Sequence, residues 1–421
     1  MTVVNTFAHI ADVHLGENHN PAIKKLEIET FSKTLDICIE RKVDFILICG
    51  DLFHVPIPDL EVVKEAVTKM RKVKELGIPI YAIYGSHDYT PTGTSIIDLI
   101  ESSGVLVKIA RGKVDDDKLK LDFVQDEKTR AKLVGINARK MGLESKYYEI
   151  LDRESLEQEE GFKVFAFHSG LDEFKPHHLR LMETIAISLF PKDFDYYAGG
   201  HIHKRSENSL PGYEKVVFPG ALTGYGRDLE DTSKGEKRGF YIVNFTDKLE
   251  NVEFVENKPV ESIYYEYDPT GKSSVQVQTE LKENLAQLDV AGKIIVLKVS
   301  GELSGGKISD IGFPSLVEEL RQRGAIDIHL NKHGLKSKEY TAIATAGEES
   351  TAIESRIFKE NIGEVKVSVE ALQNESGLRI SNELLEILRV GKQENETKES
   401  YERRLREHAL EVLGAKKVID G

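Results

Sequence analysis

Five apolar runs in this 421-residue sequence end on residue types that can bind a metal or move a proton. The five ends are Asp12-Val13-His14, Gly50-Asp51 with His54 close behind, Gly85-Ser86-His87-Asp88, His168-Ser169-Gly170 and Gly200-His201-Ile202-His203. A single histidine in mid-strand, such as His9, is most simply a core residue whose ring nitrogens have hydrogen-bond partners. Six of the thirteen histidines lie in these five ends, however, and core packing does not explain that gathering. We therefore expect a functional site there.

The residue types at these ends indicate which chemistry the site performs. Imidazole and carboxylate ligands, with no thiolate among them, suit Mn²⁺, Fe or Zn²⁺. Asp51 could bridge two metals because its two oxygens point apart. His201 and His203 share a face if the chain is extended there, or reach two neighbouring metals if it turns tightly. Two metals roughly 3.5–4 Å apart activate a hydroxide and bind the oxygens of a phosphoryl centre, so the ligand types predict phosphoester hydrolysis.

The segments before these ends must position them, and they read as β-strands. The predicted strands are Val3–Ala11, Val43–Cys49, Ile78–Tyr84, Lys163–Phe167 and Asp195–Gly199. Most are continuous apolar runs, which is typical of a sheet covered on both faces. Apolar residues recur at helical spacing from Ile28 to Ile39, and again from Val62 to Val73 behind a predicted cap at Asp59. This alternation predicts a layered α/β domain, with ligands gathered at the carboxyl ends of the strands.

Composition narrows the class of protein. Forty per cent hydrophobic and 30% charged residues indicate a soluble globular chain, and its length predicts two to three domains. No apolar run approaches the roughly 20 residues of a membrane span, and no basic region precedes the first one, so we expect a cytoplasmic protein. Cys38 and Cys49 are the only cysteines, which excludes a disulfide framework. The net charge of −14 argues against coating nucleic acid by bulk charge, but not against a nucleic-acid enzyme with bound cations.

Changes in composition and in the apolar pattern divide the chain into four regions. We expect a first domain over residues 1–262, a small α+β domain over 263–346, a polar linker over 347–374 and two amphipathic helices over 375–421. The narrow apolar stripes of these helices, around Leu384 and Leu405, need a surface to cover them. That surface is either the body of this protein or another chain.

The order of the motifs (D-x-H, G-D, G-x-H-D, H-x-G, G-H-x-H) resembles the calcineurin-like metallophosphoesterase superfamily. The stretches "HIADVHLG", "GDLFH", "GGHIHKR", "VFPGAL" and "GFYIVNF" most resemble the DNA double-strand-break repair nucleases of the meiotic-recombination-eleven family, called SbcD in bacteria, and within it an archaeal member. The resemblance covers residues 1 to about 245. It implies an α/β metallophosphoesterase sandwich with a smaller α+β capping domain and a C-terminal helix-loop-helix.

The same resemblance implies roles for individual residues and two Mn²⁺ ions per chain. One ion would be held by Asp12, His14, Asp51 and His203, and the other by Asp51, Ser86, His168 and His201. His87 would act near the scissile phosphate as general acid or transition-state stabiliser. His54 would help to place the DNA strand at the rim of the site.

Ser86 departs from the family pattern, because the superfamily usually has asparagine before the His-Asp pair. A hydroxyl is a poorer ligand than a carboxamide oxygen. Three interpretations stay open: Ser86 binds directly or through a water and lowers the affinity for the second ion, the site works with one metal, or the chain has become a scaffold. Retention of every other ligand type argues against the last.

The implied function is a manganese-dependent DNA exonuclease and single-strand endonuclease that processes double-strand-break ends. The implied partners are DNA ends, a second copy of the chain and an SMC-like coiled-coil ABC ATPase that binds the C-terminal helices; no membrane is involved. Two alternatives remain: another metallophosphoesterase, such as a nucleotide phosphodiesterase, or a weakly or non-catalytic subunit that bridges DNA. A protein phosphatase is disfavoured, because the second motif reads "GDLFHVP" and not G-D-x-x-D-R-G.

Overall fold

The computed structural model describes residues 4–90, 94–139, 143–175, 183–337, 374–393 and 396–413. The chain divides into two compact units. The first comprises Met1–Glu266, Asp289–Lys298 and Val317–Asn331, and the second comprises Tyr267–Leu288, Val299–Leu316 and Lys332–Gly421. The domain boundary expected at residue 262 stays a prediction. Those expected at 346 and 374 also stay predictions, because residues 338–373 lie outside the described ones. All the residues that we expect to do chemistry belong to the first unit.

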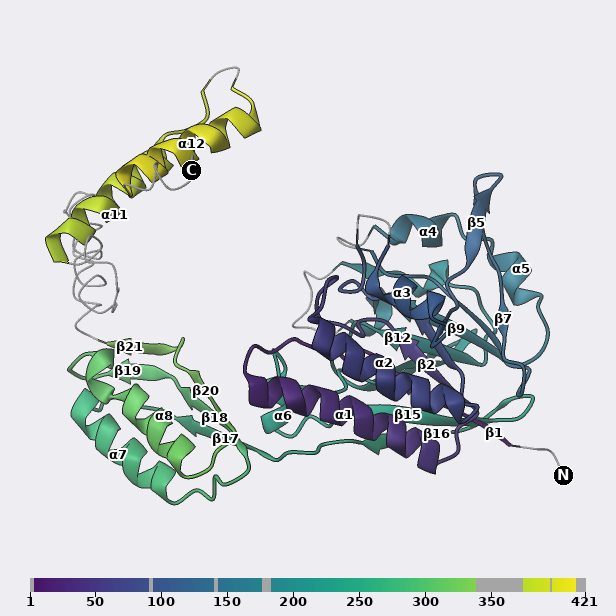
Figure 1. Cartoon of the computed structure of the whole chain (residues 1–421), viewed down its shortest axis with the longest axis horizontal. Coiled ribbons are helices and arrows are strands. Elements are labelled where there is room, and N and C mark those ends of the chain that lie inside the picture. Colours follow the sequence, from purple (N-terminus) through teal and green to yellow (C-terminus); the bar gives the residue numbers. More distant parts are fainter. Residues whose placement is uncertain are drawn as a thin grey trace. The chain divides into compact units, whose positions relative to one another are not determined.

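One layer of the first unit is a six-stranded sheet with the strand order β16-β15-β1-β2-β3-β4. Its strands are β1 (Asn5–Ile10), β2 (Phe45–Cys49), β3 (Ile80–Ile83), β4 (Val107–Lys108), β15 (Gly239–Phe245) and β16 (Leu249–Glu256). The first four are parallel, while β15 is antiparallel to β1 and to β16. Three helices pack on one face: α1 (Pro21–Glu40), α2 (Leu60–Glu75) and α3 (Ile96–Ser102). Helices α1 and α2 lie side by side (Figure 1).

A second six-stranded sheet has the order β13-β14-β12-β9-β8-β7. Its strands are β7 (Val124–Gln125), β8 (Lys132–Gly135), β9 (Lys163–His168), β12 (Tyr196–Gly200), β13 (Ser206–Leu210) and β14 (Tyr213–Phe218). Short elements pack on its outer face, namely α4 (Ser145–Glu149), α5 (Arg153–Glu157), η2 (Asp172–Phe174) and η4 (Ile187–Leu189). The four central strands β8, β9, β12 and β14 are parallel.

The two sheets meet through aromatic rings. Phe7 of β1 stacks on Phe45 of β2 with ring centroids 4.9 Å apart, and it meets Tyr196 of β12 edge-on at 5.4 Å. All three rings are fully buried. Each sheet is therefore covered by helices or short elements on one face and by the other sheet on its second face.

This arrangement confirms the predicted layered α/β fold and differs from the expectation in one respect. The five predicted strands belong to two sheets, β1, β2 and β3 to one and β9 and β12 to the other. A strand covered by a helix and a strand covered by another sheet are equally apolar, so the sequence pattern could not separate them. The five ends consequently meet across the junction of two sheets, and not along the edge of one.

The remaining elements are shorter or lie toward the C-terminus. They are the pair β5 (Gly112–Asp115) and β6 (Lys118–Leu121), the pair β10 (Gly170–Leu171) and β11 (Thr184–Ile185), and α6 (Leu229–Ser233). A small sheet joins β17 (Ser262–Tyr267), β18 (Ile294–Val299) and β20 (Asp327–Asn331). The second unit holds α7 (Ser274–Ala286), η5 (Ile308–Ile311) and the pair β19 (Gly301–Leu303) and β21 (Leu335–Ser337), and α8 (Phe313–Gln322) begins in it.

Helix α6 links the small sheet to the body of the first unit. The Glu230 carboxylate pairs with Lys298 of β18 at 3.1 Å and accepts a hydrogen bond from Asn331 of β20 at 3.1 Å. A buried apolar cluster lies beside these contacts, made of Ile23, Leu26, Tyr225, Leu229, Ile294 and Val296. Helix α6 is thus fixed to α1 on one side and to two strands of the small sheet on the other.

The predicted amphipathic segments at the C-terminus are helices α11 (Asn374–Arg389) and α12 (Lys398–Val412). Their junction is tied by Arg404, which pairs with Glu396 at 2.9 Å, and by the Tyr401 hydroxyl, which donates to the Val390 carbonyl at 3.1 Å. Leu388 is 66% exposed, so part of the apolar stripe is uncovered within the described residues. None of the described helices is long and apolar enough to cross a membrane.

Helix α1 carries a buried polar row that braces the loop after β1. The Glu27 carboxylate is fully buried and accepts a hydrogen bond from the Gly16 N–H at 3.0 Å. Farther along the helix, the Asn257 amide donates to the Thr30 carbonyl and the Thr34 hydroxyl, at 2.9 and 2.8 Å. Burial raises the pKa of Glu27 to about 7, so the carboxyl is held largely neutral below that pH.

We predict that Glu27→Gln removes a pH dependence from the stability of the fold. The pKa of Glu27 is about 7 in the folded state against 4.5 for an ordinary glutamate, so the folded state binds the proton more tightly. Wild-type stability should therefore fall as the pH rises from about 5 through 7, by up to about 3 kcal/mol for this group. Glutamine keeps the shape of the side chain and cannot ionise. The free energy of unfolding of the variant, relative to that of the wild type, should therefore be higher at pH 8 than at pH 5 by that amount.

The measurement is urea unfolding followed by circular dichroism at pH 5 and pH 8. The exposed Glu29 of the same helix offers a matched control, because Glu29→Gln should change the free energy of unfolding by less than about 0.5 kcal/mol. A difference between Glu27→Gln and wild type that is the same at both pH values would contradict the assignment.

Candidate metal centre

The ends of five strands meet where the two sheets join. Asp12 and His14 follow β1, Asp51 follows β2 and the Ser86-His87 turn follows β3. His168 is the last residue of β9, and His201 and His203 follow β12. The structure therefore brings the ends of all five predicted strands to one place.

Nitrogen and oxygen atoms converge at this place. The Nε2 atoms of His14 and His203 are 3.1 Å apart, and the Nε2 atom of His14 is 3.6 Å from Oδ2 of Asp51. The same Asp51 oxygen lies 3.1 Å from Nε2 of His168. Oδ1 of Asp12 lies 3.8 Å from the Nε2 atoms of both His168 and His203. Asp51 thus stands between two histidine groups, where a bridging carboxylate is expected.

The charges at this centre favour a cation. Asp12 and Asp51 are almost completely buried, and burial raises the pKa of Asp12 to about 6. Burial alone would lower the pKa of His168. The negative charge and the hydrogen bond of the Asp51 carboxylate have a larger combined effect and raise this pKa to about 10. Two buried carboxylates therefore demand positive charge, which a proton on the imidazole or a bound metal ion supplies. These N and O donors fit a divalent transition metal.

Backbone carbonyls and a carboxylate turn the histidines toward the centre. Nδ1 of His168 lies 2.8 Å from the Cys49 carbonyl oxygen, and Nδ1 of His203 lies 2.6 Å from Oδ2 of Asp228. Because these oxygens only accept, Nδ1 carries a proton in each ring, and Nε2 is the nitrogen at the centre that would bind a metal once any proton on it is displaced. Such outer partners fix the orientation of metal-binding histidines. Sequence reasoning missed Asp228, which follows no predicted strand and lies 25 residues from His203.

His201 and His203 face different neighbours. The ring of His201 lies 5.2 Å from that of His168, whereas the ring of His203 lies 4.9 Å from that of His14. The backbone of His201 has φ +82°, so the chain turns there and is not extended. This geometry favours the second of the two predicted alternatives, in which the pair reaches two neighbouring metal positions.

Backbone conformation at the centre is strained. Four of the seven predicted ligands have positive φ angles, namely Asp12, His14, Asp51 and His201. Non-glycine residues rarely adopt this region, and each instance costs of order 1–3 kcal/mol unless the surroundings enforce it. Here the N–H of His201 donates to both oxygens of Asp12, at 2.9 and 3.0 Å, and the N–H of His14 donates to the Asp51 carbonyl at 2.9 Å.

Close packing explains two of the glycines at the strand ends. A Cβ atom on Gly85 would lie 2.0 Å from Oδ1 of Asp51, and one on Gly50 would lie 2.3 Å from Nδ1 of His168. Gly50 also has φ +86°, where an L side chain is strained. Only glycine lets the ends of β2, β3 and β9 approach this closely.

Asp88 anchors these loops and does not face the centre as a ligand. Its carboxylate is 1% exposed and accepts hydrogen bonds from the N–H groups of Gly85, Leu52 and Phe53, at 3.0, 3.3 and 3.2 Å. It therefore ties the loop after β2 to the loop after β3. The N–H of His87, next to it, donates to Oδ1 of Asp51 at 2.7 Å.

The remaining predicted residues lie around the centre. The ring of His87 packs edge-on against His14 at 4.8 Å, and its Nδ1 is 2.5 Å from the His54 carbonyl oxygen. Arg227 approaches Nδ1 of His54 at 3.4 Å and pairs with Glu17 at 3.0 Å. Sequence reasoning missed Arg227 and Glu17. Ser86 is half-buried in the turn before His87, and its role as a ligand stays a prediction.

Residues 6–205 match the calcineurin-like phosphoesterase family, and this stretch includes all seven predicted metal ligands. The chain contains a calcineurin-like metallophosphoesterase domain. Domains of this family bind divalent metals, and the groups Asp12-His14-His203 and Asp12-Asp51-His168 could each hold such an ion. The match thus confirms the predicted metallophosphoesterase domain, and the structure confirms its layered α/β fold.

Several proteins are similar to this chain. The DNA double-strand break repair protein Mre11 of Archaeoglobus fulgidus is 28% identical over 332 residues, which cover 72% of this chain and 71% of that protein. The Mre11 protein of Methanococcus maripaludis is 27% identical over 68% of this chain and 77% of its own. The metallophosphoesterase YhaO of Bacillus subtilis is 27% identical over 59% of each chain. A dimetal phosphatase structure from Danio rerio, at 10% identity and a TM-score of 0.37, covers 60% of this chain and 99% of its own, too distant a likeness to compare the sites.

We predict that Asp228→Asn weakens divalent metal binding. The asparagine oxygen can still accept the proton of Nδ1 but no longer carries the charge that makes His203 a strong ligand. We expect the affinity for Mn²⁺ to fall about tenfold to a hundredfold in a calorimetric titration. Asp231→Asn is the control, because Asp231 is exposed on the same helix. Equal affinities of the two variants would show that Asp228 does not orient a ligand.

Proposed function

We propose that this protein is a DNA nuclease that holds two Mn²⁺ ions at the junction of the sheets and hydrolyses phosphodiester bonds at DNA ends. The position of Asp51 carries the proposal, because one of its oxygens lies within 3.6 Å of the Nε2 atoms of both His14 and His168. That is the arrangement expected of a carboxylate that bridges two metals. When bound, the ions would supply an activated hydroxide and stabilise negative charge on the phosphoryl oxygens.

The protein's own residues would position the substrate and move a proton. Nδ1 of His87 donates to the His54 carbonyl oxygen, which leaves Nε2 as the ring nitrogen that, in the imidazolium form, would donate a proton to a phosphoryl or leaving-group oxygen. Arg227, beside His54, places a positive charge at the rim of the centre. A phosphodiester anion would bind this arginine in place of Glu17, which pairs with it in the structure.

DNA as the substrate is supported by the relatives. Those from Archaeoglobus fulgidus and Methanococcus maripaludis are named for DNA double-strand break repair, and each aligns over about two thirds or more of this chain. The motifs that suggested the same family, including "GDLFH" and "GGHIHKR", contain Asp51, His54, His201 and His203. Ser86 is proposed as a weak ligand, direct or through a water, of the second ion.

Exposed apolar side chains on two parts of the chain are available to the proposed partners. Ile57, Leu60 and Leu99 are 87%, 77% and 56% exposed near the start of α2 and on α3, and a second copy of the chain would cover them. On the C-terminal helices, Leu388 and Leu413 are 66% and 45% exposed. We propose that these two leucines contact the coiled coil of an SMC-like ABC ATPase, where paired helices would complete their stripe.

We predict that the purified chain with Mn²⁺ cuts single-stranded overhangs and hairpins of DNA, and that chelation abolishes the cutting. His87→Ala should slow cleavage by about a hundredfold or more while DNA binding persists, because a proton donor has been removed and no ligand. The exposed His408 of α12 provides a control variant, His408→Ala, that should cleave at the wild-type rate. Gel assays on end-labelled DNA measure both.

The alternative functions give different outcomes in these assays. Hydrolysis of nucleotide diesters with no cleavage of any DNA would indicate a nucleotide phosphodiesterase. DNA binding without cleavage, under every metal condition, would indicate a scaffold that bridges DNA. Either result would end the nuclease proposal.

We predict that Leu388→Glu combined with Leu413→Glu abolishes binding to the ATPase coiled coil and leaves the isolated nuclease at its wild-type rate. Both side chains are exposed, so the variant should fold normally. His408→Glu adds one such charge to an exposed polar position of α12 and should still bind the coiled coil. Pull-down against the ATPase measures the first effect, and loss of nuclease activity in the leucine variant would mean that these helices support the catalytic unit.

A further inference from the structure

A small pocket adjoins the loops that carry the metal-binding histidines. It has a volume of about 220 Å³ and is lined by Leu171, Phe174, Lys175, Ile202, Lys204, Arg205, Ser206 and Phe218. Ile202 stands between His201 and His203 in the chain, and Leu171 follows His168 by three residues. Whatever occupies this pocket therefore touches the two loops that hold three of the predicted ligands.

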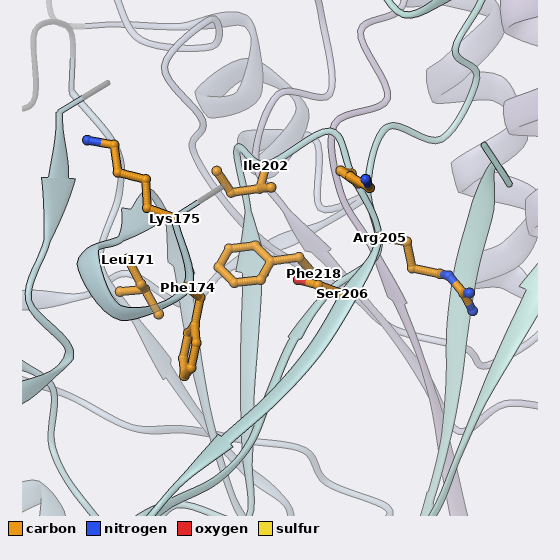
Figure 2. Close-up of a pocket in the computed structure, with 8 residues that line it drawn as sticks. Leu171, Phe174, Lys175, Ile202, Arg205, Ser206 and Phe218 are labelled. Atoms are coloured by element: carbon orange, nitrogen blue, oxygen red, sulfur yellow. The ribbon is translucent and has the colours of Figure 1, made fainter. Parts of the chain in front are cut away.

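The floor of the pocket is apolar and aromatic. Leu171 and Phe218 are each 1% exposed and Ile202 is 7% exposed, while the ring of Phe174 is half-buried. Figure 2 shows these four side chains gathered together, with Lys175 and Arg205 on opposite sides of them. A flat apolar group can lie against such a floor, and Ser206 adds one hydroxyl for a polar edge.

The rim of the pocket is basic. Three of its eight lining residues are cationic and none is acidic, although the chain as a whole has a net charge of −14. Arg205 lies over the ring of Phe254 at 4.5 Å, and Nζ of Lys175 is 3.5 Å from the Thr184 hydroxyl. Lys204 is exposed and pairs with no carboxylate among the described residues. The occupant should thus combine a flat apolar part with negative charge beside it.

We propose that this pocket binds one unpaired nucleobase of a DNA strand whose neighbouring phosphates lie along Lys204 and Arg205 toward the metal centre. The inference rests on the proposed nuclease function and adds a binding site to it. Single-stranded DNA is recognised by aromatic side chains that stack on bases and by basic side chains that follow the backbone. The volume is below the 300 Å³ or more of drug-sized sites, which suits a single base.

The test compares two single-stranded oligonucleotides of equal length, one normal and one abasic throughout, in the presence of a chelator so that neither is cut. The wild type should bind the normal strand about tenfold more tightly than the abasic one. Phe174→Ala and the milder Phe174→Leu should both lose most of this preference. Phe123→Ala is the matched control, since Phe123 is a half-buried phenylalanine of the same core cluster that does not line the pocket.

A second variant tests the basic rim. Lys204→Gln should weaken binding of both oligonucleotides alike and lower the slope of log affinity against log salt by about 0.7, the value for one lost contact to a single-stranded phosphate. Hydrolysis of bis(p-nitrophenyl) phosphate with Mn²⁺ checks that the metal centre of each variant is intact.

The results separate this inference from the nuclease proposal. Equal binding of normal and abasic strands by the wild type would overturn the pocket assignment, and so would equal losses in Phe174→Ala and Phe123→Ala. Failure of the wild type to cut DNA with Mn²⁺ would instead overturn the nuclease function, because the base preference is measured without cleavage.

Discussion

The burial of two carboxylates at one point is the constraint on which the rest of the structure depends. Asp12 is fully buried and Asp51 is 2% exposed, and each lies within 4 Å of the same His168 nitrogen. Unpaired, such charges would destabilise the fold by several kcal/mol each, because water is excluded from them. The ring of imidazoles, the hydrogen bonds from His201 and the place for a cation all offset that cost. The fold and the chemistry are consequently stabilised by the same atoms.

Strand ends can supply these ligands only if the backbone bends within one residue. Positive φ angles at Asp12, His14 and Asp51 make the bend. Asp88 holds the loops after β2 and β3 by accepting three backbone N–H groups, and the N–H of His14 ties the loop after β1 to the Asp51 carbonyl. Glycines allow the loops to approach within the distance that a Cβ atom would occupy. The fixed geometry of these loops matters for activity, because a site whose groups are misplaced by an ångström loses much of its activity.

The sequence predicted the five strands and the residues at their ends because local signals encode them. Apolar runs define the strands, Asp59 caps α2 as expected at 3.0 Å from the Glu61 N–H, and the ligand types stand beside each other in the chain. The partition into two sheets was not predictable, since Phe7 reads as the same apolar residue whether a helix or a second sheet covers it. Asp228 and Arg227 were missed for a different reason. Their contacts to His203 and His54 join residues 25 and 173 positions apart, and no local pattern marks them.

Helix α6 and the residue before it contact both the candidate metal centre and the small sheet. Asp228, at its first turn, holds Nδ1 of His203, and Glu230, two residues later, holds Lys298 of β18 and Asn331 of β20. The helix is a single turn, so displacement of one contact is transmitted to the other with little loss. If a change at those strands moves α6, it also moves the partner of His203, and by the reciprocity of coupled sites a ligand bound at the centre then acts on the strands. The small sheet and the candidate metal centre are therefore joined through two residues of one short helix.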